Sequence, residues 1–395
     1  MQTNFEKINE LAETYRDYTA RHLSELVRIK SVSLQEEQVQ RKLMQQMQDA
    51  GFDEVRMDGF GNVIGRIGYG SKVIAFDGHM DTVDMGQISN WEFDPLSGEI
   101  LDGYVLGRGS TDQKGGVAAF VTAGRMLKEL GFDRDMTIYF VGSVVEEDCD
   151  GLCWKYIVEE EDIRPELVIS TEPTNLGIYR GQRGRMEMHV TFQGVSSHGS
   201  APERGKNAIY LAARAALEIE KLNDQLRHDD FLGKGSITIS EIISGSPSLC
   251  AVADYARIHL DRRLTWGETK ESAIAEVEAA VNGLQAKVET LYYKEKSFTG
   301  LVYGMEKYYP TWLLPEDHDA VQKGVKTFEI LFGKTPRVDK WTFSTNGVTI
   351  NGYYGIPVIG FGPGNEVMAH APNEKVPVDD LVKASAFYTG LVFNL

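Results

Sequence analysis

Three features are absent from the sequence, and their absence limits the classes of protein to which it can belong. Residues Met1 to Glu6 contain neither a basic nor an apolar stretch, so they do not resemble a secretory signal. No apolar run approaches the ~20 residues that span a bilayer. Only three cysteines occur, Cys149, Cys153 and Cys250, and three cannot all pair. We therefore expect a cytoplasmic protein with free thiols and no membrane partner.

The chain also lacks a cluster of basic residues. It has 41 Lys and Arg against 58 Asp and Glu, a net charge of -17. An acidic surface repels phosphate backbones, which argues against nucleic acid as a partner. The phosphate-loop spacing G-x-x-x-x-G-K-[ST] and internal repeats are absent too. What remains is ordinary globular composition, with 42% apolar and 25% charged residues.

Length and pattern together predict two domains. The chain has 395 residues, more than the roughly 250–300 at which a single core stops growing. A helical stripe covers residues 5–29, and a second helix follows at 36–50. Short apolar strands then alternate with helices, as in strand 73–76, helix 115–130, strand 136–145 and strand 167–170. This alternation favours an α/β fold with a mixed, mainly parallel sheet flanked by helices.

Between about 183 and 298 the pattern changes to that of an α+β ferredoxin-like module. The expected order is strand 185–192, helix 205–226, strands 236–243 and 251–261, helix 268–283 and strand 286–293. The α/β pattern then resumes with helix 317–331, strand 357–360 and helix 378–391. We predict that residues 183–298 are inserted into a domain made of 1–182 and 299–395, with hinges near 181 and 300.

Histidines and carboxylates gather in five short segments, and each segment is expected to place one of them at or just past the carboxyl end of a strand. The segments are Asp77–Val83, Gly107–Gly116, Glu146–Asp148, Ser170–Thr174 and Ala369–Glu374. In open α/β sheets, ligands bind at the carboxyl ends of the strands. Nitrogen and oxygen donors suit zinc, and also manganese or cobalt. The carboxylates exceed the needs of one zinc ion, which favours two metals that share a bridging carboxylate.

Each of these signals alone has a plainer interpretation. A single histidine after a strand is more often a core or surface histidine than a ligand. Glu146 and Glu147 alone would be a solvated charge pair. The glycines between 107 and 116 would form a tight turn before a helix, or a phosphate-binding loop.

Taken together, the five segments resemble the di-zinc metallopeptidase family. This family includes acetylornithine deacetylase, succinyl-diaminopimelate desuccinylase, glutamate carboxypeptidase, peptidase T and aminoacylase. The resemblance covers nearly the whole chain in the right order, and it implies a zinc-peptidase-like catalytic domain with an inserted lid and dimerisation domain. It also implies two metal ions, one held by His79 and Glu172, the other by His370 and Glu147, with Asp112 bridging them.

The resemblance assigns further roles beside the metals. Glu146 would be the general base that takes a proton from the bridging water and passes it to the leaving nitrogen. Asp81 would hold the far ring nitrogen of His79. The Asp112–Gln113 peptide bond would be cis; the plainer alternative is a trans bond in an ordinary turn.

The inserted module carries a second group of candidates. Ser197–Pro202 resembles the lid motif of the family, in which the histidine, here His198, polarises the scissile carbonyl, often in the active site of a partner subunit. A homodimer through this module is therefore implied. Asn207 and Arg263 would hold the carboxylate or carbonyl of the substrate. Without the resemblance, these residues would be a surface histidine, a helix cap and a strand-end charge.

One segment departs from the pattern of the relatives. Many carry an Asp and an Arg upstream of the last histidine, whereas this chain has Phe343–Val348 without either. We therefore predict only the class: an enzyme that cleaves a peptide, N-acyl or ureido bond in a small amino-acid-like substrate. The alternatives are a catalytically inactive scaffold or binding protein on the same fold and a dinuclear phosphoesterase.

Overall fold

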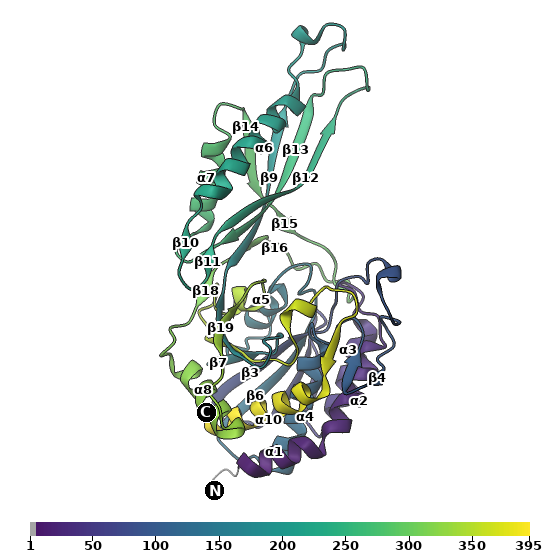
Figure 1. Ribbon diagram of the computed structural model, residues 1–395, viewed down its shortest axis with the longest axis vertical. Helices are drawn as coiled ribbons and strands as arrows, with labels where there is room; N and C mark the ends of the chain where they lie inside the picture. The colour runs from purple at the N-terminus through teal and green to yellow at the C-terminus, as the bar shows by residue number, and fades with distance from the viewer. Residues whose placement is uncertain (1–4) are drawn as a thin grey trace.

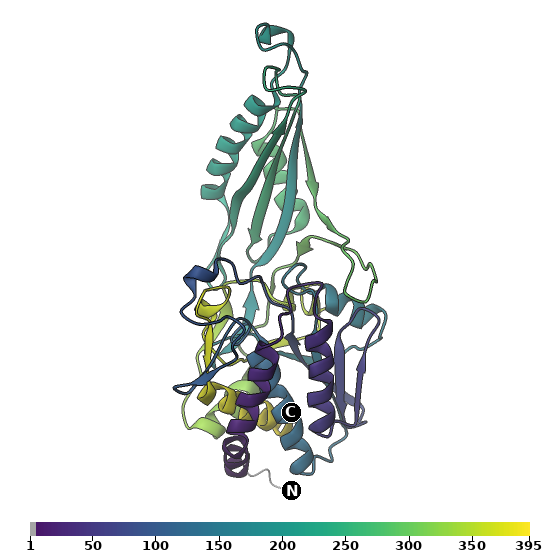
Figure 2. The same cartoon turned by 90° about the vertical axis from the view of Figure 1, so that its right-hand side faces the viewer.

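The computed structural model describes residues 5–395 and has two parts stacked along one long axis (Figures 1 and 2). The lower part, called the body here, contains the large sheet and the helices from both ends of the chain. The upper part, called the lid, is a smaller sheet with two helices. The lid stands on one end of the body and extends away from it (Figure 2).

The body is built on a nine-stranded mixed sheet in the order β1-β2-β6-β3-β7-β20-β8-β18, with β19 beside β8. Its strands are β1 (Glu54–Met57), β2 (Val63–Ile67), β3 (Lys72–His79), β6 (Met136–Ser143), β7 (Leu167–Ser170), β8 (Ile178–Gln182), β18 (Trp312–Leu313), β19 (Val338–Trp341) and β20 (Val358–Gly360). The four central strands β6, β3, β7 and β20 are parallel, and antiparallel strands flank them. The predicted mixed α/β sheet is confirmed.

Helices cover both faces of this sheet. They are α1 (Phe5–Thr14), α2 (Arg16–Val27), α3 (Glu37–Asp49), α4 (Lys114–Glu129), α5 (Leu152–Glu159), α8 (Asp319–Phe332), α9 (Gly347–Ile350) and α10 (Val378–Asn394). Neighbouring residues of a strand face opposite sides. Gly78 of β3 lies under Val117 of α4, while Asp77 contacts Trp154 of α5 and Asn346 before α9. The central strands are therefore buried on both sides, which explains their continuous apolar runs.

The lid sheet is antiparallel, in the order β12-β13-β9-β14. Its strands are β9 (Gly184–Gln193), β12 (Ser236–Gly245), β13 (Tyr255–Leu264) and β14 (Ala286–Thr290), and its helices are α6 (Ala208–Gln225) and α7 (Lys270–Ala280). Met188 and Val190 are buried in the lid core, whereas His189 and Thr191 are only partly buried. Because helices cover only one face of this sheet, polar and apolar residues alternate along β9. β17 (Tyr308–Tyr309) also pairs with β9, and the boundaries at 183 and 298 stay a prediction.

Several short elements complete the chain. A small sheet joins β4 (Ile100–Leu101), β5 (Tyr104–Leu106) and β21 (Lys375–Pro377), and two hairpins pair β10 (His228–Asp229) with β11 (Gly233–Lys234) and β15 (Tyr292–Tyr293) with β16 (Met305–Glu306). The helix expected over residues 5–29 is two helices that meet at Tyr15. No helix within residues 5–395 has the length and apolarity needed to cross a membrane. The cysteines are unpaired, as expected, and only Cys250 is exposed.

Candidate metal centre

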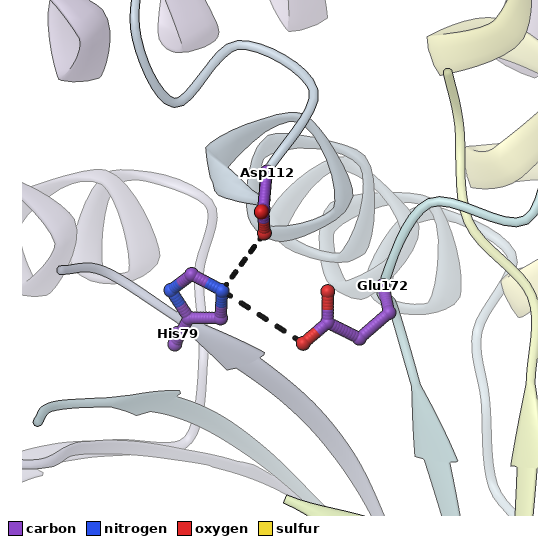
Figure 3. Close-up of side chains that lie close together, drawn as sticks. All are labelled: His79, Asp112 and Glu172. Carbon is purple, nitrogen blue, oxygen red and sulfur yellow. Dashed lines mark hydrogen bonds and ion pairs between the residues drawn. The ribbon is translucent and has the colours of Figure 1, made fainter. Parts of the chain in front are cut away.

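The structure brings the five predicted ligands together in two groups that share Asp112. In the first group, His79 Nε2 lies 3.0 Å from Asp112 Oδ1 and 3.8 Å from Glu172 Oε1 (Figure 3). In the second, His370 Nε2 lies 2.9 Å from Glu147 Oε2 and 3.5 Å from Asp112 Oδ2. Within each group, the candidate ligand atoms all lie within 4.8 Å of one another. Each group can therefore surround one cation, with Asp112 between the two.

The sheet places three of these segments side by side. His79 is the last residue of β3 and is paired with Ser143, the last residue of β6. Glu172 follows β7 by two residues. Asp112 and His370 depart from the expectation, because Asp112 lies in the loop before α4 and His370 in the loop between β20 and β21. The Asp112–Gln113 bond is cis, as predicted.

Glu374, which has no assigned role in the sequence analysis, connects these two loops. Its buried carboxylate accepts three backbone N–H groups from the Gly109–Asp112 segment, at 2.9 to 3.1 Å, and Arg108 Nη1 at 2.6 Å. Arg108 also donates to the main-chain oxygen of His370. The pair thus fixes Asp112 relative to the loop of His370. The sequence does contain a signal for this role, because Glu374 lies four residues after His370 in the candidate segment Ala369–Glu374.

The turn after β6 is held tightly. Val145 has φ of +63°, which a β-branched residue rarely adopts unless neighbours impose it. Here Glu36 accepts the Val145 N–H, and the Asp81 carboxylate accepts the N–H groups of Glu146 and Glu147 at 3.2 and 3.0 Å. This corrects the role expected for Asp81. His79 Nδ1 donates to the main-chain oxygen of Asp81 at 2.8 Å, while the Asp81 carboxylate is 3.7 Å away because it is engaged by the turn.

The electrostatics of the cluster fit bound cations. Burial raises the pKa of Glu146 and of Glu172 well above the usual carboxyl range. Burial alone would lower the pKa of His79, but the charges of Glu146, Asp112 and Glu172 raise it well above its ordinary value. Among the described residues, nothing donates a hydrogen bond to the buried oxygens Glu146 Oε1 and Glu172 Oε2. Buried carboxylates without donors are costly, and metal ions would supply the missing positive charge.

These residues line a cavity of about 240 Å³ between the body and the lid base. Beyond the metal candidates and Glu146, its walls include Asp150, Arg185, Arg263, Phe343, Ser344 and Glu366. Arg263, which the resemblance assigns to the substrate, lines this cavity, and its guanidinium is paired with Asp261 at 2.7 and 3.0 Å. Phe343 and Ser344 belong to the segment that departs from the relatives. Sequence reasoning missed Asp150 and Arg185, which belong to no motif.

The other lid candidates lie away from the cavity. His198 is exposed at the far end of the lid, where its Nδ1 contacts Ser200 Oγ at 2.7 Å. Asn207 caps α6 by accepting the Ile209 N–H at 2.9 Å. The structure therefore brings neither of them to the metal candidates of the same chain.

Comparison with known proteins identifies the family. The model of peptidase family M20/M25/M40 matches residues 75–394. The chain belongs to this family. As an M20 protein it is a metal-dependent hydrolase, and the resemblance found in its motifs is confirmed.

Relatives of this M20 chain align along most of its length. It is 51% identical to the Escherichia coli (strain K12) protein named "Uncharacterized protein YgeY", over 98% of this chain and 96% of that one. It is 27% identical to the succinyl-diaminopimelate desuccinylase of Hydrogenovibrio crunogenus, over 94% and 97% of the two chains. The aminopeptidase PepT structure from Bacillus cereus shares the fold, with a TM-score of 0.72, 24% identity and coverage of 96% and 98%.

Proposed function

We propose that this M20 chain hydrolyses an amide bond in a small amino-acid-like substrate, either a dipeptide or an N-acyl or ureido amino acid. The observation that carries the proposal is the pair of ligand groups that share Asp112 in one cavity of about 240 Å³. A cavity of this size suits a small molecule rather than a protein chain. The name of one relative, a succinyl-diaminopimelate desuccinylase, supports the same substrate class.

His79, Asp112 and Glu172 would hold one divalent ion, and Asp112, Glu147 and His370 the other. Zinc fits these nitrogen and oxygen donors, with cobalt or manganese as alternatives. When bound, such a pair polarises a carbonyl group and lowers the pKa of water.

Glu146 would be the general base. It is 4% exposed, lines the cavity and belongs to neither ligand group. Burial raises its pKa, which suits a carboxylate that accepts a proton from water near neutral pH and then returns it to the leaving nitrogen. Arg263 would meet a carboxylate of the substrate, in exchange for part of its contact with Asp261.

We also retain the homodimer and the cytoplasm as proposals. β12 is an edge strand of ten residues without Lys or Pro, and Ile242, Ile243 and, on α6, Leu217 are exposed. Long unprotected edges invite pairing with another chain. A second copy paired here would bring its own lid beside the first, and His198 would act across the dimer. Unpaired cysteines agree with a reducing compartment.

The test combines metal content with turnover. Elemental analysis should find about two zinc, cobalt or manganese ions per chain for a site of this kind. A panel of dipeptides, N-acyl and ureido amino acids should yield one hydrolysed class. Glu146→Gln should keep both ions but lose roughly 10²–10⁴-fold in kcat. Metal without turnover on any amide would favour an inactive scaffold, and turnover of phosphate esters instead would favour a phosphoesterase. Full activity in Glu146→Gln would refute the mechanism.

A further inference from the structure

The lid is connected to the body by two strand segments that remain paired across the junction. Arg185 of β9 is paired with Tyr309 of β17 on the lid side. Gln182 of β8 is paired with Trp312 of β18 on the body side. Between them, the Gly184 N–H donates to Thr311 Oγ1 at 3.0 Å. We call residues 182–185 and 309–312 the hinge ribbon.

The turn that carries Glu146 and Glu147 touches the lid base through its next three residues. Asp148 Oδ2 accepts a hydrogen bond from Tyr293 Oη at 3.2 Å. Cys149 Sγ accepts one from Tyr309 Oη at 3.3 Å. The Asp150 carboxylate lies 3.4 Å from Arg185 Nη1. Two of the partners, Tyr309 and Arg185, belong to the hinge ribbon, and Tyr293 lies in β15 directly after the last lid strand.

The Tyr309–Cys149 contact and the Asp150 carboxylate are shielded from water. Tyr309 and Cys149 have no exposed surface, and Asp150 is 3% exposed. A buried hydroxyl that loses its acceptor finds no water in its place, so the Tyr309–Cys149 contact resists separation. On its opposite side, the turn is fixed to the body by Asp81 and Glu36. The turn is thus held between the body and the hinge ribbon.

We propose that Tyr293, Tyr309 and Arg185 are positioning residues that connect the hinge ribbon to the Glu146–Glu147 turn, so that the orientation of the lid sets where Glu146 lies. This inference rests on the proposed role of Glu146. A shift of the lid base moves Asp148, Cys149 and Asp150 with it, two to four residues from that carboxylate. Misplacement of a catalytic group by ~1 Å can reduce rate about 10²-fold.

The experiment uses two pairs of tyrosines. The Tyr293→Phe/Tyr309→Phe double variant removes both hydroxyls but keeps the rings. Tyr292→Phe/Tyr308→Phe is the matched control, because neighbouring residues of a strand point to opposite faces. Tyr292 is 62% exposed, and Tyr308 packs against the lid core. Full-length metal-loaded proteins are compared for kcat, KM, metal content, melting temperature and hydrogen exchange of the peptide covering residues 144–151.

The proposal expects kcat of the test variant to fall roughly tenfold or more, with KM within about twofold and both metals retained. Exchange in residues 144–151 should quicken only in the test variant. Equal kcat and equal exchange in both variants would overturn the proposal, and so would a kcat loss explained by lost metal. Glu146→Gln in the same assay separates the two hypotheses. If it is inactive while the test variant equals its control, only the hinge inference fails; if it is active, both fail.

Discussion

The body and the lid differ in how many of the predicted site residues each one places at the cavity. In the body, every predicted ligand lines one cavity, and His79 and Glu172 lie at the carboxyl ends of strands that are buried on both faces. In the lid, only the base reaches that cavity, through Arg185 and Arg263. His198 lies beyond the far end of β9, a strand of ten residues that spans about 30 Å.

This difference separates two kinds of functional residue. Metal ligands need fixed positions within a fraction of an ångström, and a body buried on both faces supplies them. Residues that meet the substrate in passing can be delivered by a motion or by a second chain. The lid sheet, with one helix-covered face and an unpaired edge at β12, is suited to either.

The sharpest test of the body concerns its shared ligand. Asp112→Asn should release both metals and abolish activity, because each ligand group depends on that carboxylate. The loss should exceed the roughly 10–100-fold effect of changing a residue outside the metal shell. His370→Ala should release only one ion, since the other group remains complete. Metal analysis after gel filtration measures both. Equal metal loss in the two variants would contradict a shared Asp112.

The lid makes a contrasting prediction. His198→Ala should retain both metals yet lose roughly 10²–10³-fold in kcat if the imidazole stabilises the developing negative charge. Co-expression of Glu146→Gln with His198→Ala tests which chain supplies it. If His198 acts across a symmetric dimer, each mixed dimer contains one intact site of two. About half of the co-expressed dimers are mixed, so the preparation recovers roughly a quarter of wild-type activity. No recovery would place its action within one chain.

The β12 edge offers a smaller, structural test. Ile242→Lys puts a charge on the exposed edge, where charges oppose pairing. We expect a monomer by analytical ultracentrifugation and a kcat no lower than that of His198→Ala. Thr238→Lys, on the same strand, provides a comparison nearer the base. A dimer that persists in both variants would exclude this edge as the interface.

The last prediction, with the smallest expected effect, concerns the stability of the body at acid pH and does not involve the lid. Burial lowers the pKa of His22 in α2 to about 4. The unfolded chain, with a His pKa near 6.5, binds a proton first as pH falls, so stability is complete above 6.5 and declines toward 4. The free energy of unfolding should fall by about 3 kcal/mol over this range. Urea titrations should show a flatter pH dependence in His22→Gln; an unchanged slope would contradict the assignment.

Much of the fold was predictable from the sequence because periodicity is strong where burial is regular. The apolar run of β3 and the alternation of β9 are examples. Some elements of the structure were not predicted. Strands such as β18 are too short to show a repeating apolar pattern, and α5 follows the Glu146–Glu147 turn directly. The break between α1 and α2 at Tyr15 was also missed, because one apolar stripe runs through both helices.

The site was predictable only where several segments formed a joint pattern. The five ligands come from such segments, and the structure brings them together. Arg185 and Asp150 meet only through the fold, and a single Arg or Asp carries no pattern. The partner of His79 Nδ1 is a main-chain oxygen. Every residue has such an oxygen, so the residue types in the sequence do not reveal this contact.

The pairing of Gln182 with Trp312 has a consequence for the history of the chain. Topologically, the entire lid is one loop closed by neighbouring residues of the body sheet. Each doubling of a flexible loop costs only about 0.6 kcal/mol of closure entropy. Insertions in the lid, deletions from it or its exchange therefore change the stability of the body little. Such an arrangement lets descendants acquire new substrates by remodelling the loop while the ancestral hydrolytic core passes on unaltered.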